Sequence, residues 1–134
     1  MPEAAELASG ANFASVATVL PGGLIQNQII WVGVENGVLN LNTEVHRAKY
    51  FNVTGDPRIT VLIRDEHDPY RYVEVRGELA ETIIGDRARS QIDELARKYT
   101  GKDYPPDDIR TERVILRIAP VRQIYIHQKA GVSD

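Results

Sequence analysis

The stretch "IIWVGVENGVLNLN", residues 29–42, has the pattern of two short strands joined by a tight turn. Asn36-Gly37 is a pair that two-residue type I′ hairpin turns prefer, because both central residues need a positive φ. We therefore expect residues 38–42 to pair antiparallel with the strand before them. The next residues, "TEVHRAKYFN" at 43–52, mark a change from strand to a short helix.

Strand patterns continue on both sides of this hairpin. Each run is rich in β-branched residues or alternates apolar and polar residues, and turn residues bound it. With the hairpin included, the predicted strands cover residues 15–20, 24–34, 38–42, 58–64, 71–83 and 113–127. Pro120 interrupts the last run and cannot donate to a central ladder, which predicts a bend or bulge there.

Two helical segments interrupt the strands. The short one ends at Asp56-Pro57, and the longer one is expected to start with Asp86 as its N-cap and to stop at Gly101. Its apolar residues form one stripe that should pack on the sheet, with no role beyond packing: Ala88, Ile92, Leu95, Ala96 and Tyr99. Six or seven strands with few helices predict a mainly β fold, a closed or nearly closed antiparallel barrel.

Composition narrows the function classes. The 134 residues fit a single domain over residues 1–134, and a net charge of -3 with a pI near 5.6 disfavours a nucleic-acid partner. We find no membrane-spanning apolar stretch and no signal peptide, so we expect a cytoplasmic protein. The chain has no cysteine, and its three histidines are too far apart for a local metal motif. Any redox chemistry must therefore come from an organic cofactor.

Arg47 and Lys49 lie where the strand gives way to the helix, and two interpretations are open. They are either solvated surface cations or the holders of an anion, with the Thr43 hydroxyl and the helix start beside them. The chain has no glycine-rich phosphate loop, so side chains would have to bind a phosphate. Two objections stand: residues i and i+2 share no helix face, and Glu44 would repel an anion.

The order of motifs resembles the pyridoxamine 5′-phosphate oxidase-like split-barrel flavoproteins over residues 14–122. Within them the chain is most similar to the subgroup that uses the deazaflavin coenzyme F420. The most specific residues are Thr43, Arg47, Lys49 and Asn52 followed by Asp56-Pro57-Arg58, and then "YRYVEVRG" at residues 70–77. One departure is the sequence "NQIIW", because members usually carry a proline shortly before the equivalent of Trp31.

The resemblance implies a six-stranded antiparallel split β-barrel that forms a homodimer, with cofactor sites between the protomers. By this resemblance the phosphate ligands are Thr43, Arg47 and Lys49. The residues that border the tricyclic ring are Gln28, Ile30, Trp31 and Asn42, and Tyr72 reaches the partner's site. Other interpretations are a solvent-facing strand position for Gln28, a core or interface position for Trp31 and ordinary half-exposure for Tyr72.

The implied reaction is hydride transfer between the deazaflavin and an activated double bond of a small organic substrate. Because the cofactor carries this chemistry, no catalytic residue is assigned. Two alternatives are an FMN-dependent oxidoreductase and a non-catalytic cofactor-binding protein. Candidates for binding a longer anionic tail, or else surface cations, are Arg58, Arg64 and Arg71. Apolar residues on both faces of the strands also favour a homodimer.

Overall fold

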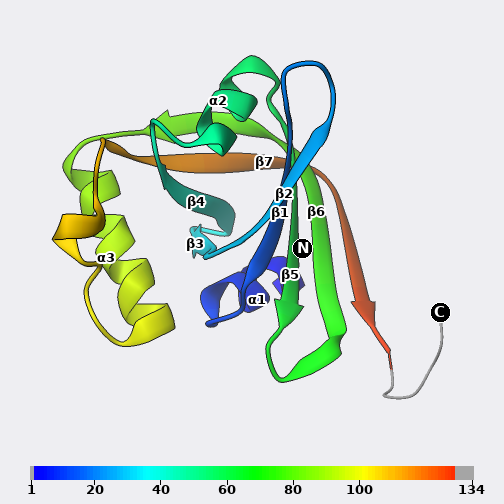
Figure 1. The fold of residues 1–134 in the computed structure, drawn as a ribbon. Helices are drawn as coiled ribbons and strands as arrows, with labels where there is room; N and C mark the ends of the chain where they lie inside the picture. The colour runs from blue at the N-terminus through cyan, green and yellow to red at the C-terminus, as the bar shows by residue number, and fades with distance from the viewer. Residues whose placement is uncertain (1, 129–134) are drawn as a thin grey trace.

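The computed structural model describes residues 2–128, which form an antiparallel sheet flanked by three α-helices (Figure 1). The elements are α1 (Pro2–Ser9), β1 (Ala14–Val19), β2 (Ile25–Ile30), β3 (Gly33–Glu35), β4 (Val38–Glu44), α2 (Ala48–Gly55), β5 (Arg58–Asp65), β6 (Asp68–Ile83), α3 (Asp86–Thr100), the 3-10 turn η1 (Pro106–Asp108) and β7 (Arg113–His127). Figure 1 shows α1 and α2 toward opposite ends of the strands, with α3 to one side. In this described part, no helix is long and apolar enough to cross a membrane.

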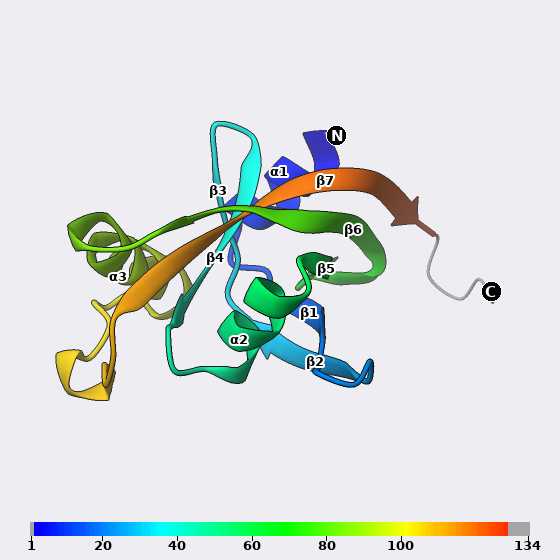
Figure 2. The ribbon, with the colours of Figure 1, turned by 90° about the horizontal axis from the view of Figure 1, so that it is seen from above.

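The order of strands in the sheet explains how it curls. The order is β2-β1-β5-β6-β7-β4-β3, so the two edge strands follow one another in the chain. Only Trp31 and Val32 separate β2 from β3. Because this short link must join both edges, the sheet bends into a nearly closed barrel, which confirms the predicted mainly β fold. The long strands β6 and β7 cross the full width of the molecule (Figure 2).

The prediction of one continuous strand over residues 24–34 was wrong, because the strand breaks at Val32. The N–H of Val32 donates to the Tyr99 hydroxyl at 3.1 Å, and its carbonyl accepts from Lys98 Nζ at 2.7 Å. Side chains of α3 thus bind the backbone groups that a neighbouring strand would otherwise bind. The sheet within residues 2–128 accordingly has seven strands, where the resemblance implies six.

The predicted hairpin and strand alternation are confirmed. Glu35 pairs with Val38, and Asn36 and Gly37 between them have φ values of 52° and 79°. In β5 and in residues 73–79 of β6 every second residue faces the core, as the apolar alternation indicates. Among the fully buried residues of this core are Leu41, Val61, Ile63, Val73, Leu116 and Ile118.

Of the two predicted ends of α3, one is confirmed and one is wrong. Gly101 caps α3 in the left-handed conformation at φ 81°, as expected. Asp86, predicted as the N-cap, is instead the first helical residue, and Gly85 precedes it at φ 81° with no side-chain cap bond. The sequence analysis also missed α1, whose eight residues carry too short a stripe to show a helical period. Its Leu7 and Ala8 are nonetheless buried in the core.

Pro120 lies at an irregularity, as its position predicts. Gly77 pairs with Pro120, whereas the preceding residue, Arg76, pairs with Arg122. Val121 is therefore an extra residue on β7, and it is largely exposed. The bulge lets a residue without an N–H sit inside a long central strand.

Candidate functional site

The late start of α2 brings Arg47 and Lys49 to the same place. The helix begins at Ala48, and Arg47 before it is extended, with φ -74° and ψ 146°. Arg47 therefore does not follow the helical repeat, and the geometric objection to a shared ligand disappears. Both residues line one pocket of about 300 Å³, which we call the Lys49 pocket.

The Lys49 pocket has an apolar wall and a polar wall. The apolar and aromatic lining consists of Phe13, Ile29, Ile30, Trp31, Ile92, Leu95 and Tyr104. The polar lining consists of Asn42, Thr43, Arg47, Lys49 and Arg113. Trp31 stacks on Tyr99 with ring centroids 5.3 Å apart and meets Tyr104 edge-on at 6.2 Å. Such a lining suits a flat aromatic ligand that carries an anionic group.

Arg113 is the cation that sequence reasoning missed. It is the first residue of β7 and pairs with Glu44 of β4, so its place depends on a long-range register. The side chain is buried: its Nε donates to Asn42 Oδ1 at 2.8 Å, and its guanidinium lies 5.2 Å from the centre of the Tyr104 ring. Burial lowers the pKa of Arg113, and the nearby Arg47 adds to that effect.

Lys49 shows that positive charge accumulates in this pocket. Its pKa is lowered, first by burial and then by the positive charges of Arg47 and Arg113. No carboxylate among residues 2–128 forms an ion pair with Lys49, whereas Arg47 Nε lies 3.9 Å from Glu44 Oε2. A half-buried ammonium beside two guanidinium groups, without an anion of its own, is an unfavourable arrangement until an anionic ligand binds.

Glu44 does not oppose an anion in the way the sequence suggested. It is fully buried and does not line the pocket, and its Oε1 accepts hydrogen bonds from the backbone N–H groups of Arg110 and Thr111 at 2.6 and 3.1 Å. Burial alone raises its pKa, but these bonds and the charges of Arg113 and His46 lower it overall. One buried carboxylate thus partly balances the cations, which leaves an excess of positive charge.

The structure brings six of the eight predicted cofactor-binding residues into the pocket lining and leaves two outside. Those inside are Ile30, Trp31, Asn42, Thr43, Arg47 and Lys49. Gln28 is exposed on the edge strand β2 opposite Val16, and Tyr72 is half-buried on β6 between Arg64 and Ile126. Neither lines the pocket of its own chain, and their proposed roles stay predictions.

Two asparagines named in the sequence analysis, Asn52 of the motif and Asn42, have clear positions. Asn52 is buried and donates to Thr18 at 3.0 Å and to Gln26 at 2.7 Å, which fixes α2 on β1 and β2. Asn42 borders the pocket, but both of its amide protons donate inside the protein, to Ala88 and Gln91. Asn42 therefore has no donor left for the edge of a cofactor ring.

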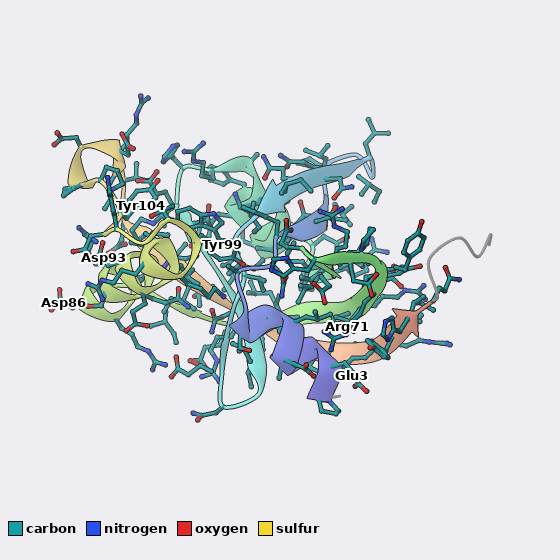
Figure 3. The ribbon with its side chains drawn as sticks, turned by 90° about the horizontal axis from the view of Figure 1, so that it is seen from below. Glu3, Arg71, Asp86, Asp93, Tyr99 and Tyr104 are labelled. Atoms are coloured by element: carbon teal, nitrogen blue, oxygen red, sulfur yellow. The ribbon has the colours of Figure 1, made fainter. Side chains whose placement is uncertain are left out.

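The three tail candidates are bound to carboxylates elsewhere. Arg58 pairs with Asp56 at 2.6 Å and Arg64 lies 3.7 Å from Glu66. Arg71 contacts Asp65 and Glu6, and Figure 3 shows it on the opposite side of the molecule from Tyr104. None of the three lines the Lys49 pocket.

The apolar stripe of α3 does more than the predicted packing. Ala88 and Ala96 are buried against the sheet, but Ile92 and Leu95 also line the pocket. Sequence reasoning also missed Phe13 and Tyr104, which reach the same wall from two loops. No local pattern marks these two residues, because only the folded chain brings them together.

Comparisons with known proteins show which folds the chain resembles. Neither the protein-family models nor the curated proteins contain a match. Among solved structures, an F420 reductase is similar with a TM-score of 0.79 and 28% identity, over 89% of this chain and 94% of that one. A pyridoxamine 5′-phosphate oxidase-related, FMN binding protein from Nostoc punctiforme gives 0.62 and 20%, over 86% and 74%. A heme binding protein from Mycobacterium smegmatis gives 0.68 and 22%, over 98% and 55%.

These likenesses agree with the nearly closed antiparallel sheet and with the motifs noted in the sequence. They extend over 89% and 86% of this chain. The chain therefore has the split-barrel fold of pyridoxamine 5′-phosphate oxidase-like proteins and resembles that family.

Proposed function

We propose that the protein is a coenzyme F420-dependent oxidoreductase that transfers a hydride between the deazaflavin and an activated double bond of a small organic substrate. The observation that carries this proposal is Lys49, half-buried and without a carboxylate partner among the described residues, in a pocket with an aromatic wall. A phosphate would supply the missing anion, and a planar ring would fill the apolar side. The 28% identity with an F420 reductase supports the deazaflavin.

The pocket residues divide into two roles under this proposal. Thr43, Arg47 and Lys49 hold the phosphate, and Arg113 joins them. Ile30 and Trp31 border the ring. When bound, the cofactor supplies the hydride chemistry. The chain binds the phosphate, orients the ring and keeps water away from one of its faces. No side chain is assigned as a proton donor.

One observation favours FMN as the second candidate. The three cations of the pocket converge on one place, which suits a terminal phosphate dianion. The tail candidates Arg58 and Arg71 are engaged by carboxylates and offer nothing to a longer anionic tail. FMN has such a terminal phosphate, whereas F420 has an internal phosphodiester and a carboxylate tail.

Titration of cofactor-free protein with each cofactor tests the choice, with the quenching of Trp31, the single tryptophan, as the signal. We expect F420 to bind more tightly than FMN. Tight binding of FMN with none of F420 would overturn the first candidate. A non-catalytic carrier would bind its reduced cofactor but would not oxidise it with any of a panel of quinones, enones and tetrapyrroles.

We also propose a homodimer. Leu24, Ile25 and Ile29 lie in or beside the edge strand β2 and are 76%, 62% and 69% exposed, an apolar surface that a two-fold partner would cover. Ile29 also lines the Lys49 pocket, so this interface would border the cofactor site, and Tyr72 would reach the partner's pocket.

Sedimentation tests the dimer. We expect a species of twice 15.0 kDa at micromolar concentration and a shift toward monomer in Ile25→Lys, since Ile25 does not line the pocket. A wild-type monomer under these conditions would contradict the proposal.

A further inference from the structure

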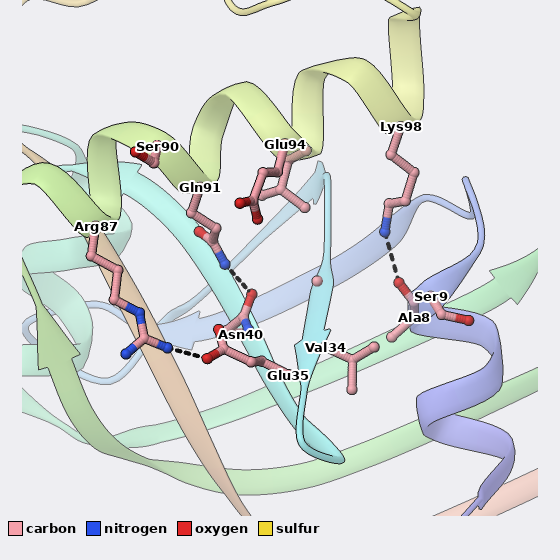
Figure 4. A pocket seen from close by; sticks show the side chains of 12 residues that line it. Ala8, Ser9, Val34, Glu35, Asn40, Arg87, Ser90, Gln91, Glu94 and Lys98 are labelled. Atoms are coloured by element: carbon pink, nitrogen blue, oxygen red, sulfur yellow. Dashed lines mark hydrogen bonds and ion pairs between the residues drawn. The ribbon is translucent and has the colours of Figure 1, made fainter.

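Four side chains form a continuous hydrogen-bonded chain that starts in the Lys49 pocket and ends in a second cavity, which Arg87 and Lys98 of α3 also line. Arg113 Nε donates to Asn42 Oδ1 at 2.8 Å, Asn42 Nδ2 donates to Gln91 Oε1 at 2.8 Å, and Gln91 Nε2 donates to Asn40 Oδ1 at 2.5 Å. Arg113, Gln91 and Asn40 are buried and Asn42 is half-buried. Figure 4 shows the last link, between Gln91 of α3 and Asn40 of β4.

The direction of every bond in this chain follows from Arg113. A guanidinium can only donate, so the oxygen of Asn42 must face Arg113 and its amide nitrogen must face α3. The two amide protons of Asn42 then reach Gln91 and the carbonyl of Ala88, the latter at 2.9 Å. Gln91 in turn accepts with its oxygen and donates with its nitrogen. No amide can rotate by half a turn without losing a buried hydrogen bond.

Gln91 is the polar exception on the buried face of its helix. The other buried residues of α3 are apolar: Ala88, Ile92, Leu95 and Ala96. An apolar side chain would satisfy packing at this position, and burying an amide costs free energy unless each group is bonded. Gln91 lines the second cavity and not the Lys49 pocket, so it does not touch a ligand bound beside Lys49.

We propose that Gln91 is a positioning residue for the anion site. It holds Asn42, and Asn42 fixes Nε of Arg113, whose Nη1 also lies 3.9 Å from the buried Glu44 Oε2. The plane of the guanidinium is thus set, and an N–H group of Nη2 is directed at the anionic group of the ligand before it binds. A planar guanidinium that is oriented in advance loses less freedom on binding. This inference rests on the proposed function, because it takes Arg113 to be a ligand of the cofactor phosphate.

A double-mutant cycle tests the proposal with F420 and FMN as the probes. Gln91→Met keeps the size of the side chain and removes both bonds, and we expect the Kd to rise on the order of tenfold. In an Arg113→Met background, which has no donor for Asn42, the same substitution should add almost nothing. In a Lys49→Ala background it should keep its full effect, because Lys49 is outside the chain of bonds. An equal effect in all three backgrounds would overturn the positioning role.

Loss of stability alone is excluded by a matched variant. Ile115→Val removes one methyl group from a buried residue close to Arg113 that does not line the pocket. It should lower the melting temperature and leave the Kd unchanged. If Ile115→Val weakens binding as much as Gln91→Met does, the proposal is wrong.

A ligand-free measurement separates this proposal from the proposed function. In the wild type, the Arg113 Nε–H should exchange slowly with water in NMR spectra, and Gln91→Met should accelerate that exchange while Ile115→Val should not. An unchanged exchange rate in Gln91→Met overturns the positioning role whatever the cofactor. If wild type binds neither cofactor, the proposed function fails, and the same cycle is measured with inorganic pyrophosphate. An effect of Gln91→Met on pyrophosphate affinity that differs between the backgrounds supports the positioning role. An equal effect in all of them, or no effect, overturns it.

Discussion

Two cavities flank α3, and they differ in whether their cations have acceptors within the described part of the protein. In the Lys49 pocket, Lys49 has no carboxylate partner among the described residues. In the second cavity, of about 530 Å³, Arg87 pairs with Glu35, and Lys98 Nζ donates to the carbonyls of Ala8 and Val32, both at 2.7 Å. We call this second one the Lys98 cavity.

The difference shows that size alone does not identify a ligand site. The Lys98 cavity is larger, but its Lys98 and Arg87 already have acceptors within the protein (Figure 4). In the smaller Lys49 pocket, Glu44 balances the cations only in part, and Lys49 has no acceptor among the described residues. An unpaired charge in a partly buried place lowers the stability of the fold. Such a charge marks a candidate ligand site, because a bound ligand of opposite charge offsets this loss.

The largest expected effect comes from removing the unpaired cation. Lys49→Ala should lose a charge-assisted bond worth about 1.5 to 3 kcal/mol, a roughly tenfold to hundredfold rise in the Kd of the preferred cofactor. Lys49→Glu should bind more weakly still, because it places like charges together. Fluorescence titration measures both, and rising salt should weaken the wild type more steeply than Lys49→Ala.

Arg87→Ala is the matched control, since it removes a cation of the Lys98 cavity whose charge Glu35 already balances. Cofactor affinity should stay at the wild-type value in this variant. Wild-type affinity in Lys49→Ala, or an equal loss in both variants, would break the distinction between the two cavities.

A smaller effect is expected in the Lys98 cavity, which Gly33 and Asn40 both line. A Cβ on Gly33 would lie 2.5 Å from Asn40 Oδ1, and Gln91 holds that oxygen in place. Gly33→Ala should therefore lower the free energy of unfolding by about 1 to 3 kcal/mol, as overpacking does. Gly55→Ala is the control, because nothing lies within 4 Å of its Cβ position. Chemical denaturation measures both, and equal stabilities would show that Asn40 moves freely.

The smallest expected effect is a change in how steeply the free energy of unfolding falls at low pH. The pKa of Glu44 is lower in the folded chain than its usual 4.5, so its ionised form stabilises the fold above that pH. This contribution is lost as the pH falls through the lowered pKa. Glu44→Gln keeps the acceptor for Arg110 and Thr111 but has no charge to lose, so its stability should fall less steeply below about pH 4.5.

The control for this measurement is Glu35→Gln, at a carboxylate that is half-exposed beside Arg87. Exposed ion pairs contribute little, so this variant should follow the wild-type curve in denaturation experiments at each pH. Parallel curves for wild type and Glu44→Gln would show that Glu44 adds no acid sensitivity of its own.

Local patterns were enough for much of the fold and for part of the site. The Asn36-Gly37 turn, the alternation of β5 and the stop of α3 at Gly101 all depend on residues close in sequence. Arg47 and Lys49 were found for the same reason, since they lie two residues apart beside a strand end. The helix α1 was not predicted, because its apolar stripe is too short to establish a helical period.

The sequence by itself determined which segments are strands, where they turn and which two neighbouring cations mark the site. Only the tertiary structure decided that Arg113 joins them, that α3 breaks a predicted strand at Val32 and that Gln91 lies behind Asn42. Those contacts join residues 49 to 71 positions apart along the chain. Turn and alternation preferences act over a few residues, whereas such contacts depend on strand register and on how a helix docks, which the packing of the whole core sets.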